Sequence, residues 1–258
     1  MQSDRFLLIV CMLVGFVWAC NKQQTEDYPI DYGYDYFPLA VGTEYIYQVD
    51  SIVYKPVIGG IQADSSTTFV RELTVDSLLD ESGKAWYRVE QYQRKQDTLP
   101  WQITRVLMLR RNEAEAIRTE ENLRFIKLRF PIKANESWDG NAAFDASRDF
   151  AVSGENMAIF KNWNYLVLES NGTYQEGAIN LDEVITVQNA DNENLIERRS
   201  AVERYARGVG LVYREWGLYD TQCEACCASD FALCEPLSWP EKAEKGVMIR
   251  QRLLAFHF

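Results

Sequence analysis

The chain has 258 residues, of which 47% are hydrophobic, and a formal net charge of −11 at pH 7. This length and apolar content suffice to bury a sizeable core in one large domain or two small ones. The strong negative charge argues against nucleic acid as a partner and against direct binding to anionic lipid headgroups, because both would repel the protein.

Residues 1–19 have the pattern of a bacterial lipoprotein signal peptide. Arg5 precedes the uncharged run Phe6–Val17, and Ala19 stands directly before Cys20. A helix over this run would cover about 18 Å, well short of the roughly 30 Å hydrocarbon core of a bilayer. The pattern therefore predicts cleavage after residue 19 and lipidation of Cys20. The alternatives are ordinary secretory cleavage near Ala19 and an uncleaved N-terminal anchor.

Lipidation would attach a diacylglyceryl group and an N-acyl chain, such as palmitate, to Cys20. Each buried methylene contributes roughly 0.8 kcal/mol to membrane binding, so these chains anchor a protein almost irreversibly. The protein is then held at the membrane through its N-terminal lipid, and the folded part need not touch the bilayer. Residues 20–36 are expected to form a lipidated tether, because they are polar at first and then intersperse tyrosines with glycine, proline and aspartate.

Residues 37–258 are predicted to form one β-rich domain, because alternating patterns recur and no break in composition marks a second domain. Two β-rich runs, 69–79 and 85–94, flank a glycine-containing turn over 80–84, which predicts a hairpin. Large side chains on both faces of 123–130 predict a strand that is covered on both sides.

Further strands are expected over 45–54, 101–110, 115–119, 165–170, 181–188, 196–206, 211–219 and 246–258. Asn171-Gly172 is predicted to be a turn. Residues 135–163 have weak periodicity and are expected to form an extended excursion with one short helix near 156–163. The segment 197–207 is ambiguous, because its charges suit a helix and its alternation suits a strand. Many strands with little helix indicate a mainly β fold, either a single curved antiparallel sheet or a half-open barrel.

Four cysteines of the folded part lie close together near the C-terminus: Cys223, Cys226, Cys227 and Cys234. An even number of cysteines in an exported protein indicates disulfides. A bridge between adjacent cysteines is disfavoured by peptide geometry, which leaves 223–226 with 227–234, or 223–227 with 226–234. We therefore expect a disulfide-stapled insertion near the C-terminus.

The same four cysteines allow two rival interpretations, a four-thiolate zinc or iron–sulfur site and a redox centre. The spacing C-x2-C-C-x6-C lacks the two separate C-x2-C knuckles that are typical of zinc sites. Redox activity is disfavoured because Glu224, Asp230 and Glu235 would raise the pKa of a nearby thiol. The expectation is therefore that the site holds no metal.

Residue patterns typical of catalysis are scarce. His257 is the single histidine and the penultimate residue, so a triad has no other candidate base and a two-histidine metal site is excluded. Neither a phosphate-binding G-x-x-x-x-G-K-[ST] motif nor a G-x-S-x-G motif occurs. We expect no catalytic residue and no cofactor. A glycosidase-type pair of carboxylates stays open, because acidic residues are plentiful.

Three segments together resemble an uncharacterised family of cell-envelope lipoproteins of the Bacteroidetes type. They are Tyr36–Tyr47, Phe130-Pro131 followed by Ser137–Asn141, and Tyr205–Tyr213. The resemblance covers most of the mature chain and lies in turns, strand starts and aromatic residues. It implies a lipid anchor in the outer membrane and a β-rich fold, and it implies no activity.

These observations predict a non-enzymatic lipoprotein that binds an apolar or glycan ligand in the concave face of its sheet, or a partner protein of the envelope. The alternative is an envelope hydrolase that uses two carboxylates. A deep cleft with carboxylates about 5–10 Å apart would favour the hydrolase. An apolar cavity would favour a carrier, and a filled core would favour an interaction role.

Overall fold

A computed structural model describes residues 30–258, and its secondary structure lies in the unit Tyr32–Phe258. The predicted signal peptide and the lipidation site Cys20 lie outside the described residues. The strands are β1 (Glu44–Val57), β2 (Gly60–Leu79), β3 (Ala85–Arg94), β4 (Gln102–Arg111), β5 (Glu115–Glu120), β6 (Leu123–Arg129), β7 (Ser137–Trp138), β8 (Phe150–Val152), β9 (Glu155–Met157), β10 (Tyr165–Glu176), β11 (Ile179–Glu193), β12 (Glu197–Ala206), β13 (Gly210–Asp220) and β14 (Lys245–His257). The helices are η1 (Tyr34–Tyr36), α2 (Glu224–Cys227), α3 (Phe231–Cys234) and α4 (Trp239–Lys242).

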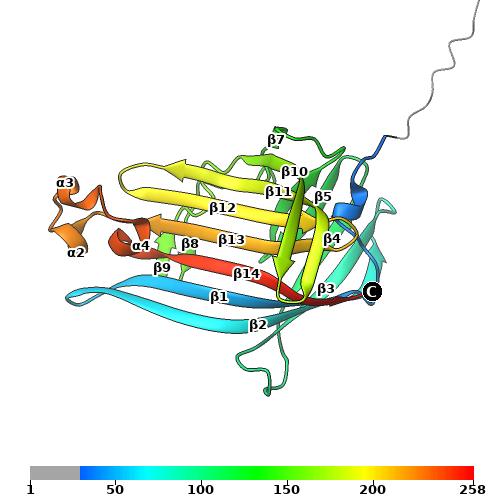
Figure 1. Ribbon diagram of the computed structural model, residues 1–258, viewed down its shortest axis with the longest axis horizontal. Helices are drawn as coiled ribbons and strands as arrows, with labels where there is room; N and C mark the ends of the chain where they lie inside the picture. Colours follow the sequence, from blue (N-terminus) through cyan, green and yellow to red (C-terminus); the bar gives the residue numbers. More distant parts are fainter. Residues whose placement is uncertain (1–29) are drawn as a thin grey trace, which may run out of the picture. The chain divides into compact units, whose positions relative to one another are not determined.

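Twelve strands form one antiparallel sheet in the order β6-β5-β4-β3-β2-β1-β14-β13-β12-β11-β10-β7, with β8–β9 as a separate hairpin (Figure 1). Pairing of β1 with β14 joins the two halves of the chain. The two end strands also meet, because Ile126 N donates to the Gly140 carbonyl at 2.8 Å and Trp138 Nε1 donates to the Ile126 carbonyl at 2.8 Å. The predicted curved antiparallel sheet is confirmed, and it is nearly closed.

The local predictions were correct where turn residues and alternation agree. β2 and β3 form the predicted hairpin, and the ambiguous segment 197–207 is the strand β12. Two local predictions were wrong. Gly172 lies inside β10 at a shift in register, so it marks an irregularity in the strand and not a turn. The expected helix near 156–163 is replaced by the end of β9 and a series of turns.

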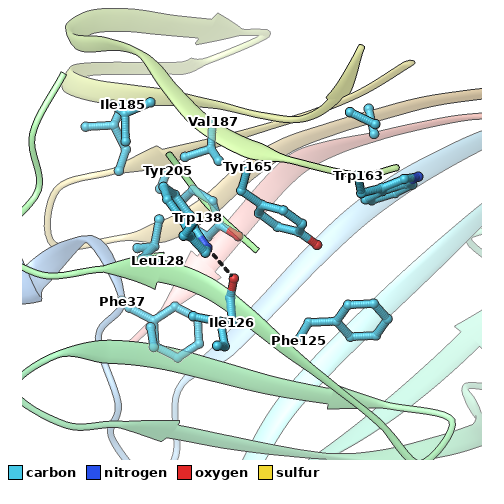
Figure 2. Packing of buried hydrophobic residues seen from close by; sticks show 14 of the residues in the cluster. Phe37, Phe125, Ile126, Leu128, Trp138, Trp163, Tyr165, Ile185, Val187 and Tyr205 are labelled. Carbon is cyan, nitrogen blue, oxygen red and sulfur yellow. Dashed lines mark hydrogen bonds between the residues drawn. The ribbon is translucent and has the colours of Figure 1, made fainter. Parts of the chain in front are cut away.

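The concave face of the sheet carries the largest apolar cluster. Phe125 from β6, Tyr165 from β10 and Tyr205 from β12 point into it, and Figure 2 shows Trp138 reaching across to β6. Trp163, from the excursion before β10, packs nearly perpendicular to other aromatic rings of the cluster. Large rings in edge-to-face contact fill such a space efficiently. This part of the concave face is therefore filled by side chains.

Strand β6 is covered on both faces, as its sequence predicted. Four successive residues are buried: Phe125, Ile126, Lys127 and Leu128. The second cover comes from the N-terminal segment, where the buried Phe37 belongs to the same apolar cluster. In Figure 2, Phe37 lies beside Ile126 and Leu128. The segment before β1 is thus part of the folded core.

The far end of the β10–β11 hairpin folds across the central strands, as Figure 1 shows. Tyr174 of this hairpin is buried with Val212 and Leu253 in a second apolar cluster. Glu176 Oε1 pairs with Arg252 of β14 at 3.1 Å. The central sheet is therefore packed on both sides at this point. Within residues 30–258, no helix combines the length and apolar character needed to cross a membrane.

Candidate functional site

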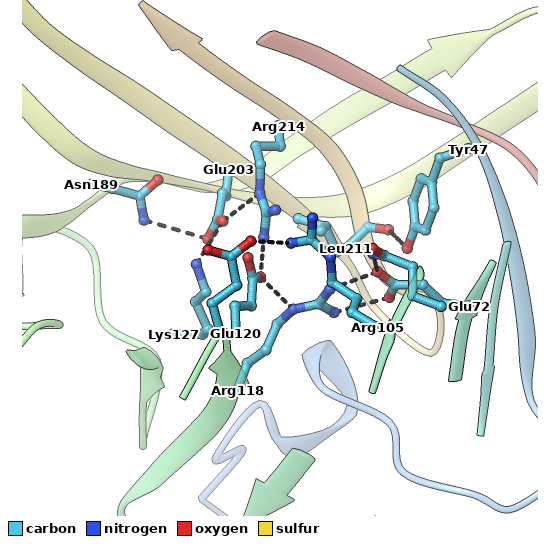
Figure 3. Close-up of polar contacts among 12 residues, drawn as sticks. Tyr47, Glu72, Arg105, Arg118, Glu120, Lys127, Asn189, Glu203, Leu211 and Arg214 are labelled. Atoms are coloured by element: carbon cyan, nitrogen blue, oxygen red, sulfur yellow. Dashed lines mark hydrogen bonds and ion pairs between the residues drawn. The ribbon is translucent and has the colours of Figure 1, made fainter. Parts of the chain in front are cut away.

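Six ionised side chains form a network inside the concave face (Figure 3), in which five are buried and Glu120 is partly buried. Its acids come from β2, β5 and β12, and its bases come from β5, β6 and β13. They are Glu72, Glu120 and Glu203, and Arg118, Lys127 and Arg214. Three negative charges meet three positive charges, so the network is neutral as a whole.

Arg118 forms one end of the network. Its Nη1 and Nη2 atoms donate to the two carboxylate oxygens of Glu72 at 2.9 and 2.6 Å, and its Nε donates to Glu120 at 2.6 Å. This fork matches the planar guanidinium to a carboxylate, and such bidentate pairs are among the strong hydrogen-bonded ion pairs of proteins. Glu72 also accepts a hydrogen bond from Gln91 at 2.8 Å. Both oxygens of Glu72 are therefore hydrogen-bonded, and Oε1 of Glu120 pairs with Arg118.

Glu203 forms the other end. It pairs with Lys127 Nζ at 2.8 Å and with Arg214 Nε at 2.8 Å, and the Tyr205 hydroxyl donates to it at 2.7 Å. Arg214 Nη2 continues to Glu120 at 3.2 Å and so joins the two ends. A buried charge is tolerated only when it is paired and hydrogen-bonded, and each acid here meets that condition.

The acids of this network stay ionised. Burial alone would raise the pKa of Glu203, but the charges of Lys127 and Arg214 outweigh burial and hold its pKa at about 2. Burial is likewise outweighed at Glu72 by Arg118 and at Glu120 by Arg214 and Arg118, so the pKa of both is lowered. A general acid needs a raised pKa near the working pH. None of the three glutamates is therefore suited to act as a general acid, and their mutual pairing has the character of a structural element.

A groove of about 640 Å³ lies at the open end of β3 and β4, beside Leu39 and Tyr87. One of its two arginines is already used within the protein. Arg111 Nη1 donates to the carbonyl oxygens of Tyr34 and Phe37 at 2.5 and 3.0 Å. Because Arg111 already donates to these two backbone carbonyls, it has fewer donors left for a glycan. This groove is therefore a weak candidate for ligand binding.

The opposite end of the sheet exposes a group of apolar side chains. They lie on the β1–β2 turn, the β11–β12 turn and α3, and are Val57, Ile58, Leu195, Ile196, Phe231 and Leu233; we call them the tip surface. Figure 1 shows these turns together at the end of the sheet that also carries α2 and α3. Ile58 is fully exposed, and Leu195 and Leu233 are 61% and 62% exposed. Exposed apolar side chains in such number mark interaction sites more often than chance.

Grooves connect the parts of the tip surface. One of about 220 Å³ joins Pro56 to Ile196 and Glu244, and one of about 370 Å³ joins Pro56 and Val57 to Glu224 and Glu244. A third joins Leu195 to Phe231. The charged residues that line the three grooves are mostly acidic: Glu193, Glu197, Asp220, Glu224, Glu235 and Glu244, against Lys242 and Lys245.

The four cysteines lie at this end of the sheet. The structure joins Cys223 to Cys234, whose Cα atoms are 5.8 Å apart, and leaves Cys226 and Cys227 as thiols. The predicted stapled insertion is confirmed, but neither predicted pairing is formed. The reason is local, because left-handed backbone at Cys223, Ala228 and Ser229 turns the chain around α2 and returns α3 to Cys223.

Glu244 holds the insertion onto the sheet. Its Oε1 accepts from the backbone N–H groups of Glu224 and Ala225 at 2.6 and 2.9 Å, and its Oε2 accepts from Gln222 N at 2.7 Å. The pKa of Cys226 is raised to about 11 by desolvation of its sulfur, by the adjacent Cys227 and by the Glu244 carboxylate. The Cys226 thiol is therefore a poor nucleophile at neutral pH, because the thiolate is the reactive form.

Comparison with known proteins identifies no family. No family model matches the chain, and neither does any curated protein. Among solved structures, the chain is similar to a candidate lipoprotein from Parabacteroides distasonis ATCC 8503, with 10% identity over 86% of this chain and 98% of the other and a TM-score of 0.31. It is also similar to lipovitellin in a structure concerned with lipid–protein interactions, with 11% identity and a TM-score of 0.30. That match covers 85% of this chain and spans 26% of the lipovitellin chain.

Proposed function

We propose that this chain is a lipid-anchored, non-enzymatic protein of the cell envelope that binds a partner protein through the tip surface. The observation that carries the proposal is the concentration of exposed apolar side chains at one end of the sheet, on three segments linked by grooves. An interaction role was the expectation for a filled concave face.

The filled concave face supports this choice over a carrier. Aromatic rings occupy one part of it, and the paired ions occupy another. An apolar ligand would have to displace both, and opening the ion network would leave buried charges without partners. The hydrolase alternative lacks support from the network, since its carboxylates have lowered pKa values.

The chemistry of the tip surface suggests the kind of partner. Apolar anchors surrounded by carboxylates fit a protein surface that presents apolar side chains together with lysine or arginine. The net charge of −11 would speed the approach of such a basic partner.

A double substitution in the tip surface tests the proposal. Photo-crosslinking from position 58 of the full-length protein in its native envelope should trap a partner, and the purified partner should bind the wild type. Ile58→Asp with Phe231→Asp should weaken this binding at least about 30-fold, because one lost hot spot is worth about 2 kcal/mol. Leu79→Asp, an exposed apolar position at the other end of β2, should leave the affinity unchanged.

Two results would count against the proposal. One is the same set of adducts from positions 58 and 79, which would mean that the tip surface has no selectivity. The other is recovery of a stoichiometric lipid or glycan by native mass spectrometry with extraction, which would favour a carrier.

The anchor is tested separately by Cys20→Ala. The substitution removes the atom to which lipid would be attached, so the protein should leave the membrane fraction and appear in the soluble envelope fraction. The measurement is fractionation followed by quantitative immunoblotting, with Cys11→Ala as a control because Cys11 belongs to the predicted signal peptide. Membrane retention of the Cys20→Ala protein would overturn lipid anchoring.

A further inference from the structure

The sulfur atoms of the insertion gather in one cluster. Cys226 Sγ lies 3.7 Å from Cys234 Sγ, and the Sγ atoms of Cys226, Cys227 and Cys234 all lie within 4.8 Å of one another. Cys223 is bonded to Cys234 and so belongs to the same group. Both of the adjacent cysteines, Cys226 and Cys227, therefore place their sulfur atoms in the same cluster.

The spacing of these atoms suits a thiolate-bound metal ion. Zinc binds four thiolates as a tetrahedron with Zn–S distances of about 2.3 Å, which places neighbouring sulfurs about 3.8 Å apart. Cys226 and Cys234 already have this separation, and Cys227 lies within 4.8 Å of both. Opening the bridge would free Cys223 as a fourth ligand without bringing in a distant residue.

The backbone of the insertion is held by bonds that do not involve sulfur. Ser229 N donates to the Cys223 carbonyl at 2.8 Å, and Asp230 N donates to the Cys227 carbonyl at 2.9 Å. Glu244 binds three more backbone N–H groups, at residues 222, 224 and 225. The four cysteines should therefore stay close together when the disulfide is reduced.

We propose that Cys223, Cys226, Cys227 and Cys234 form a redox-controlled site for a thiophilic metal ion of the zinc class. A dithiol reductant breaks the Cys223–Cys234 bond, takes the bridge as its own disulfide and leaves two thiols on the protein. The metal ion then displaces the thiol protons and binds the four thiolates, as soft ligands select zinc or copper(I) over hard cations. In the reverse step, a dithiol compound in its disulfide form would accept two electrons from Cys223 and Cys234, become a dithiol and re-form the bridge, which would release the ion.

Metal titration of the reduced full-length protein tests this site. The protein is reduced with a phosphine, freed of reductant without oxygen and titrated with zinc. We expect one zinc ion per chain and, by X-ray absorption, sulfur ligands at about 2.3 Å. Cys226→Ser with Cys227→Ser removes two ligands but leaves the disulfide pair for folding. Its zinc affinity should fall by more than about 100-fold, since even outer groups around a metal are worth 10–100-fold.

Glu224→Gln serves as the matched control, because it removes an acid of the same insertion and no sulfur. It should bind zinc within a few-fold of the wild type. Equal zinc affinity in the wild type and the double serine protein would overturn the proposal, and so would zinc held mainly through oxygen ligands. Two disulfides in protein alkylated directly in the native envelope, Cys223–Cys227 and Cys226–Cys234, would likewise overturn it.

Discussion

Glu203→Gln should lower the free energy of unfolding by about 3–5 kcal/mol, the cost of breaking a buried ion pair by removing one partner. Glutamine keeps the shape of the side chain but removes the charge that balances Lys127 and Arg214. Both cations are buried in the folded state and cannot regain water there. The measurement is urea denaturation of the full-length protein at pH 7, monitored by tryptophan fluorescence.

The pH dependence separates the lost charge from a packing defect. The pKa of Glu203 is lowered from 4.5 to about 2 in the folded protein, so its stabilisation is fully present above the unfolded value and is lost as the pH falls through about 2. That stabilisation is worth about 3 kcal/mol. The difference in stability between wild type and Glu203→Gln should therefore shrink from pH 5 towards pH 2.

Glu215→Gln provides the comparison for a surface ion pair. Glu215 accepts from Arg250 Nε at 2.9 Å, a distance like that in the buried network, but both side chains are more than 40% exposed. Exposed pairs contribute at most about 1 kcal/mol, so this substitution should have a small effect. Equal losses for the two substitutions would contradict the assignment of Glu203 to a desolvated network.

Gly246→Ala should cost about 3 kcal/mol and loosen the start of β14. A methyl group at this position would lie 2.2 Å from the Leu218 carbonyl oxygen and 3.0 Å from Tyr219 Cα, which are backbone atoms of the paired strand. The backbone has φ +146°, which L side chains rarely adopt. Overpacking and backbone strain each cost about 1–3 kcal/mol, and here both apply.

Gly60→Ala controls for the backbone conformation. Gly60 has a similar φ of +158° at the β1–β2 turn, but a methyl group there would meet no atom within 4 Å. Its cost should come from backbone strain alone, at about 1 kcal/mol, so the difference between the two substitutions measures the collision with β13. Thermal unfolding followed by circular dichroism suffices. A Gly246→Ala protein as stable as Gly60→Ala would show that β13 and β14 are not paired this closely.

Local patterns predicted most strands because alternation and turn residues act over a few neighbouring positions. The β2–β3 hairpin was predicted this way, from two β-rich runs around a glycine-containing turn. Asn171-Gly172 has the same local character, yet β10 continues through it to Glu176. The strand is extended there because Tyr174 and Glu176 pack on the central sheet, which is a contact distant in sequence.

The ion network could not be predicted from spacing. Its members come from five strands, and Glu72 and Glu203 are far apart in the chain. The signal available in the sequence was the position of each charge in the alternating pattern. Glu203 stands two residues from the inward-facing Ala201 and Tyr205, and Arg214 stands two residues from Val212 and Trp216. A charged residue in the inward phase of a strand indicates a buried partner, but the pattern does not say which one.

Composition, alternation and clustered cysteines were enough to predict the β-rich class, the curved antiparallel sheet and a stapled insertion. The sequence also predicted the lipid anchor at Cys20, which lies outside the described residues. Three features could be recognised only in the folded protein: the Cys223–Cys234 pairing, the convergence of the six charges and the tip surface. These features depend on how the sheet curves and how loops return to it, and packing between distant segments sets both.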